Sequence, residues 1–136
     1  MAHFSGDLGL KEEDIPLLQQ EIAYITENCM VEALCLSTLT GYQIVFAALP
    51  SFQIDSDALS GLSGAMVMTA KTTMNQVFRE GLTETIIRAG NGYCIIANAG
   101  RFVLVGAGHD VKEMMKTSKT FRVAAKRIEE KWPEVE

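Results

Sequence analysis

The sequence of 136 residues predicts an α+β domain, a five-stranded antiparallel sheet sandwiched by helices in the order α-β-β-α-β-β-β-α. Three observations predict this class. Strand-like segments follow one another across short turns, which is typical of antiparallel hairpins. Longer segments with apolar residues at helical spacing separate these hairpins. The strand-like segments are apolar on both sides, so both faces of the sheet must be covered.

The first part of the chain predicts an arm and then a helix. Residues 1–10 contain two glycines and little periodicity, so we expect a flexible N-terminal arm. We expect residues 11–136 to form a single domain, because no Gly/Ser-rich linker divides them and their number suits one hydrophobic core. The first helix is predicted from Lys11 to Asn28, with Asp14 as its N-cap and Glu21 on its solvated side. Its apolar stripe comprises Ile15, Leu18, Ile22 and Ile25.

The next segments predict two strands. They span Ala33–Thr38 and Tyr42–Leu49, and the turn between them contains Gly41, which can adopt a positive φ. Pro50 ends the second strand because proline has no N–H to donate to a ladder. Both strands are apolar on both sides, so we expect them inside the sheet.

A long central helix is predicted after these strands. Asp55 is suited to cap its N-terminus, and we expect the helix to end near Glu80 with Gly81 as its C-cap. Its apolar residues form two neighbouring stripes, a broader surface than contact with one sheet requires. One stripe comprises Leu59, Leu62, Met66, Thr73 and Val77, and the other Val67, Ala70, Met74 and Phe78.

The last third of the chain predicts three strands and a helix. Leu82–Ala89 mixes polar and apolar residues, as an edge strand does. Cys94–Ala97 and Phe102–Val105 form a hairpin that is apolar on both sides. Asp110 caps the final helix, which Pro133 ends. We expect the buried side of this helix to comprise Val111, Met114, Met115, Ser118, Ala125 and Ile128.

The helices are too few to cover the sheet. Five strands spaced about 4.8 Å apart make a sheet roughly 24 Å wide, whereas a helix is only about 10 Å wide. The first and last helices can cover one face, which leaves the central helix to cover about half of the other. We therefore predict a two-fold dimer through the central helix and the edge strand Thr83–Arg88. A different helix arrangement within one chain is the alternative. The predicted interface residues are Leu62, Met66, Thr69, Thr73 and Ile86.

Composition excludes several classes of function. The net charge of −5 provides no basic surface for nucleic acid or an anionic membrane. No apolar segment approaches the roughly 20 residues that span a bilayer, and the N-terminus does not resemble a signal peptide. The three cysteines have no C-x-x-C spacing, which suits a reducing compartment. We expect a cytoplasmic protein without membrane insertion.

The sequence also lacks recognisable catalytic groups. It contains no P-loop, nucleophile elbow or zinc-protease motif, and His3 and His109 are its only histidines. Cys94 could act as a nucleophile with His109, but its apolar position within a strand disfavours the thiolate. The turn 106–108 resembles a phosphate-binding loop, although Asp110 would repel an anion there. We predict no catalytic residue, no metal site and no cofactor.

Several segments together resemble a known family. They are the strand-turn-strand Leu34–Val45, the helix start Asp55–Met66, the hairpin segments Gly92–Ile96 and Arg101–Val105, and Ala124–Ile128. Over about residues 12–130 the pattern resembles the roadblock/dynein light chain superfamily, related to the longin and profilin-like folds. Thr40-Gly41 replaces the Asp-Gly often seen at the first turn, and the last helix lacks the common Gly-Leu-Val-like opening.

The resemblance implies both an assembly and a function. It implies a dimer with a continuous sheet across both subunits and paired central helices. Members of the superfamily act as scaffolds for, or regulators of, Ras-like small GTPases, and some are dynein light chains. We therefore expect a non-catalytic homodimeric interaction protein of this kind. A heterodimer with a paralogue is an alternative assembly. The alternative is a small-molecule sensor with a pocket between the sheet and Met114, Met115 and Phe121.

Overall fold

The computed structural model describes residues 3–4 and 10–134. The elements of the predicted α+β order are present, with short 3-10 turns before the first and last helices. The helices are α1 (Ile15–Asn28), α2 (Ser56–Phe78) and α3 (Met114–Lys131), preceded by the turns η1 (Glu12–Asp14) and η2 (Val111–Glu113). The strands are β1 (His3–Phe4), β2 (Ala33–Thr38), β3 (Gln43–Ala48), β4 (Glu84–Ala89), β5 (Gly92–Ala99) and β6 (Phe102–Gly108).

The sheet is antiparallel and has the strand order β1-β3-β2-β6-β5-β4. Within the described residues it contains the five predicted strands and one more, because the two-residue β1 pairs with Val45 and Phe46 of β3. The remaining residues of the predicted arm, apart from Leu10, lie outside the described residues, so its flexibility stays a prediction. β4 lies at the edge of the sheet, as the sequence predicts.

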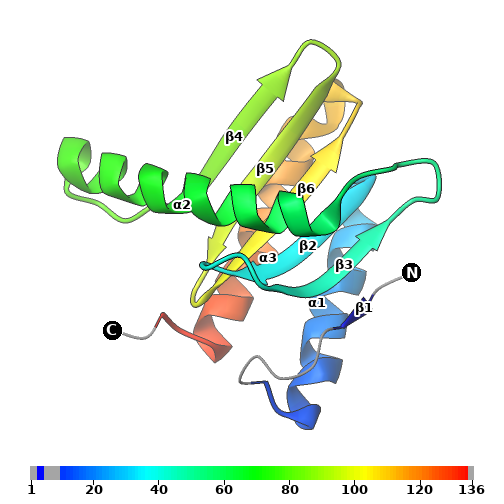
Figure 1. Cartoon of the computed structure of the whole chain (residues 1–136), viewed down its shortest axis with the longest axis horizontal. Helices are drawn as coiled ribbons and strands as arrows, with labels where there is room; N and C mark the ends of the chain where they lie inside the picture. Colours follow the sequence, from blue (N-terminus) through cyan, green and yellow to red (C-terminus); the bar gives the residue numbers. More distant parts are fainter. Residues whose placement is uncertain (1–2, 5–9, 135–136) are drawn as a thin grey trace.

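Helices cover the two faces of the sheet unequally (Figure 1). On one face, α1 and α3 pack side by side over a core of completely buried residues that includes Ile25, Leu104 and Phe121. On the other face, α2 alone packs against a smaller cluster that includes Val67 and Val105. The predicted division of two helices against one is therefore confirmed.

The first half of α2 is fixed to the turn between β2 and β3. Gly41 in this turn has a φ of +97°, the positive value predicted for it. Gly64 of α2 lies so close to the turn that a Cβ atom there would be 2.5 Å from the carbonyl oxygen of Leu39. The carboxylate of Asp55 caps the helix by accepting hydrogen bonds from the N–H groups of Asp57 and Ala58. These contacts place α2 across the sheet.

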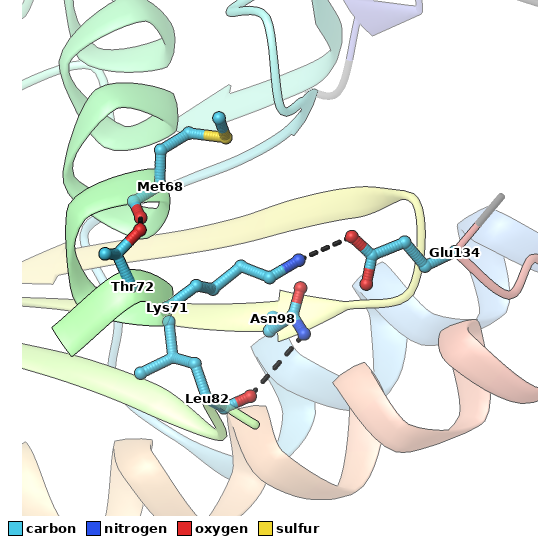
Figure 2. A network of polar contacts seen from close by, with 6 residues as sticks. All are labelled: Met68, Lys71, Thr72, Leu82, Asn98 and Glu134. Atoms are coloured by element: carbon cyan, nitrogen blue, oxygen red, sulfur yellow. Dashed lines mark hydrogen bonds and ion pairs between the residues drawn. The ribbon is translucent and has the colours of Figure 1, made fainter. Parts of the chain in front are cut away.

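The C-terminus of α2 differs from the prediction. Arg79, not Gly81, is the C-cap: its φ is +57° and its N–H donates to the carbonyl oxygen of Asn75 at 3.0 Å. The chain must turn early because Leu82, only three residues later, is buried against the sheet. Figure 2 shows that Lys71 pairs with Glu134, which ties α2 to the C-terminal segment about two turns before the helix ends.

Two expectations about the other helices are also wrong. Glu21, expected in solvent, is 5% exposed, and its Oε1 lies 3.2 Å from Nε of Arg127 on α3. Met115, expected on the buried side of α3, is 63% exposed, whereas Phe121 is fully buried. The ring of Phe121 packs directly on Gly106 of β6. The space proposed for a sensor pocket at Phe121 is therefore filled by the ring itself.

Candidate functional site

The outward face of α2 is apolar and has no partner within the described part of the chain. Leu62 is 65% exposed, and Val77 and Phe78 are 62% and 60% exposed. Thr69 and Thr73 are exposed on the same helix. The second predicted stripe, through Val67, Ala70 and Met74, packs toward the sheet instead. Leu59 and Met66 of the first stripe also pack against this cluster, whereas Leu62 and Val77, together with Phe78 of the second stripe, stay in solvent. Exposed apolar surface of this kind favours a partner.

A shallow groove runs between α2 and the edge strand β4. It has a volume of about 370 Å³. Its lining residues are Leu62, Ala65, Met66, Thr69, Ala70 and Thr85. Three of the five predicted interface residues therefore lie together in this groove, which we call the edge groove. Thr73 follows one helical turn after Thr69 on α2, where it is also exposed.

Ile86, the fifth predicted interface residue, lies on the other face of the sheet. It pairs with Ile95, whose side chain belongs to the core under α1 and α3. Because strand side chains alternate between faces, Thr85 and Ile87 point to the α2 side and Ile86 to the α3 side. Ile86 is 39% exposed and Ile87 is 37% exposed, so the edge of β4 is apolar on both faces.

The edge of β4 supplies backbone hydrogen-bonding groups as well. β4 is the terminal strand of the sheet and, within the described residues, pairs only with β5 on its inner side. A free edge presents alternate N–H and C=O groups that pair readily with another strand. Together, the outward face of α2, the edge groove and the free edge of β4 form one surface, which we call the α2–β4 surface.

Cys94 and His109 line the same groove, but within the described residues no hydrogen bond joins the thiol to the imidazole. Nδ1 of His109 lies 2.8 Å from Oε2 of Glu32, and the backbone N–H of His109 donates to the same oxygen at 2.6 Å. Burial raises the pKa of the Cys94 thiol, which disfavours the reactive thiolate. Phe52 lies edge-on to the imidazole, with the ring centroids 5.6 Å apart. The contacts of His109 therefore anchor the loop after β6 to the start of β2.

The described residues contain neither a cluster of metal-binding side chains nor a membrane-spanning helix. Within residues 3–4 and 10–134, no group of three or more His, Cys, Asp or Glu side chains is close enough to hold a metal ion. In the same part of the chain, no helix is both long enough and apolar enough to cross a membrane.

Comparison with known proteins identifies the fold. No family model and no curated protein matches the sequence. A structure described as MglB with tetrameric arrangement matches with a TM-score of 0.78 at 14% identity, over 93% of this chain and 98% of that one. The gliding protein MglB from Thermus thermophilus matches with a TM-score of 0.78 at 13% identity, over 93% and 98% of the two chains.

A roadblock domain also matches. The Roadblock/LC7 domain from Streptomyces avermitilis has a TM-score of 0.68 at 9% identity, over 81% of this chain and 92% of that one. The chain therefore has a roadblock-type fold, and the resemblance to the roadblock superfamily is confirmed at the level of the fold.

Sequence reasoning missed part of the α2–β4 surface. Ala65 lines the edge groove but is not among the predicted residues, and Thr85 lies in the predicted edge strand Thr83–Arg88 without being singled out. Thr85 carries a usable signal, since its alternation with Ile86 places the two on opposite faces, but only the pairing with β5 shows which face is which. Val77 and Phe78 appear in the predicted stripes, and their exposure adds them to the surface.

Proposed function

We propose that this chain is a non-catalytic homodimeric interaction protein that acts as a scaffold or regulator of Ras-like small GTPases. In this proposal the dimer forms through the α2–β4 surface, and the pair of α2 helices binds the GTPase. The protein acts in the cytoplasm, and a paralogue with a similar surface can replace one copy. No metal or cofactor takes part.

The observation that carries the proposal is the exposed apolar stripe of α2 beside a free strand edge. Leu62 and Val77 are more than half exposed on α2, and Ile87 adds apolar surface on β4. A two-fold axis at the edge of β4 would pair this strand with its copy and bring the two α2 helices together. An isologous contact uses one surface twice, so a single stripe suffices to bury both copies.

The GTPase is proposed from the fold and the resemblance together. The roadblock/dynein light chain superfamily, which the sequence resembles, contains scaffolds and regulators of Ras-like small GTPases. A regulator of this kind would act by positioning the groups of the GTPase itself.

The proposal is tested by mixing the purified chain with Ras-like GTPases loaded with GDP or with a non-hydrolysable GTP analogue. Light scattering coupled to gel filtration would report both the dimer and its complex. We expect a complex that contains two copies of this chain, and its loss in Thr69→Arg. Met115→Arg, which changes an exposed residue on α3, is the matched control. A dimer that binds no GTPase in either nucleotide state would contradict the GTPase proposal.

A further inference from the structure

A second apolar groove lies on the α2 side of the sheet, at the distal end of the β4–β5 hairpin. We call it the hairpin groove. It has a volume of about 520 Å³. It is lined on the hairpin by Ile87, Ala89 and Cys94, and on the opposite side by Phe52, Ile54 and His109. Figure 1 shows that the turn between β4 and β5 lies beyond α2. α2 of the same chain therefore leaves this end of the sheet uncovered.

The end of α2 carries two exposed apolar side chains, Val77 and Phe78, and extends past the sheet. After Lys71, every residue of the helix is exposed except Met74, which is partly buried. The helix ends in Val77 and Phe78, which are 62% and 60% exposed. In Figure 1 this part of α2 projects beyond β4, away from the other strands. An apolar helix end in this position has no partner within the described part of its own chain.

The groove and the helix end lie near opposite ends of β4. The loop after Phe78 leads into Glu84, the first residue of β4, within six residues. Ile87 and Ala89, which line the hairpin groove, lie in the second half of β4. When β4 pairs antiparallel with its copy, the first residue of one strand lies beside the last half of the other. The end of each α2 is thereby brought to the hairpin groove of the opposite copy.

The length of the projecting helix suits this distance. The residues from Lys71 to Phe78 rise by about 12 Å in an α-helix. Crossing from the edge of one sheet to the second strand of the next takes two strand spacings, or about 10 Å. In the opposite copy these two strands are β4 and β5, and Cys94 lies on β5. Phe78 can therefore reach the groove above Cys94.

We propose that in the homodimer Val77 and Phe78 of each α2 cover the hairpin groove of the other copy. This inference rests on the dimer proposed above and adds the occupant of the groove. It gives the dimer a reciprocal pair of apolar contacts, each far from the two-fold axis. It also explains why α2 continues beyond the sheet of its own chain with an apolar end.

Cross-linking tests this contact directly, because Cys94 is already present in the groove. Phe78→Cys would place a second thiol near Cys94 of the opposite copy. A short bismaleimide should then yield a covalent dimer on a denaturing gel, and mass spectrometry should identify the link between positions 78 and 94. The same change combined with Cys94→Ala should lose that link. Met115→Cys, exposed on α3, is the matched control and should give no link to Cys94.

Sedimentation of the same samples before cross-linking separates the two proposals. A dimer of Phe78→Cys without a link from position 78 to Cys94 would overturn the inference and leave the dimer intact. Sedimentation of the unmodified chain as a monomer at all concentrations would overturn both. As a second measurement, Phe78→Ser should weaken dimerisation at least about tenfold. An unchanged dissociation constant in that variant would overturn the inference, with Met115→Ser as its control.

Discussion

Leu62→Asp offers the sharpest test of the α2–β4 surface. The leucine is 65% exposed in the single chain, so its replacement removes little packing from the monomer. In the proposed dimer the same side chain is buried against the second copy. The aspartate would then place a charge in an apolar contact, which is strongly unfavourable without a partner of opposite charge.

The size of the effect follows from the area that Leu62 still exposes. Full burial of a leucine side chain contributes about 1.5–3 kcal/mol. Burying the exposed 65% in both copies therefore contributes about 2–4 kcal/mol per dimer. Because each 1.4 kcal/mol corresponds to a factor of ten, the dissociation constant should rise by about 30- to 700-fold. The charge adds to this loss.

The assay is sedimentation velocity over a range of protein concentrations, with circular dichroism to show that the variant is folded. Met115→Asp is the matched control, since Met115 is 63% exposed on α3 and lies outside the surface. We expect Leu62→Asp to shift the equilibrium to monomer and the control to leave it unchanged. Equal dissociation constants for Leu62→Asp, the control and the unmodified chain would refute the proposed surface.

Three further predictions concern stability. Gly106→Ala would place a Cβ atom 2.3 Å from Cζ of Phe121. We expect thermal unfolding to report a loss of about 1–3 kcal/mol, partly recovered by Phe121→Leu, and an unchanged midpoint would contradict this packing. Asp55→Ala removes the acceptor of two N–H groups at the start of α2 and should cost about 0.5–2 kcal/mol in urea unfolding, whereas Asp55→Asn should cost less. Burial raises the pKa of the Cys35 thiol above its ordinary 9.0. The neutral thiol therefore contributes its full stability below pH 9.0. This stability is lost as the pH rises through the higher pKa of the folded state. Urea titrations should show a smaller alkaline loss for Cys35→Ala; an equal loss would contradict the assignment.

Local patterns predicted most of the fold because they report local physics. Strands such as Ala33–Thr38 are apolar on both sides, which requires cover on both faces of the sheet. Asp55 caps α2 as predicted because a cap depends only on the neighbouring backbone. The position of β4 at the edge followed from its mixed polarity, which a strand buried on both sides would not tolerate.

The failures depended on contacts between distant segments. Glu21 is buried because Arg127, on another helix, supplies a countercharge that helical periodicity does not reveal. Arg79 ends α2 before Gly81 because the burial of Leu82 requires the chain to turn there. Met115 is exposed at the start of α3, and Phe121 instead fills the place on β6 that Gly106 leaves open.

The candidate site could be predicted only in part, because it too depends on contacts between distant segments. The broad apolar surface of α2 was visible in the sequence, and Leu62, Met66 and Thr69 do lie together in the edge groove. Which residues of β4 lie on the α2 face depends on the register with β5, and this register places Ile86 on the opposite face. The hairpin groove could not be predicted, because it lies at the end of the sheet that α2 leaves uncovered, and the sequence does not show where α2 crosses the sheet.

In the proposed dimer, the apolar surface left uncovered in a single chain is buried against a second copy of this chain. Sedimentation equilibrium of the unmodified protein tests it most directly. We expect a species of twice the mass of one chain that dissociates only on dilution. A folded monomer at every concentration, with no tendency to associate, would contradict it.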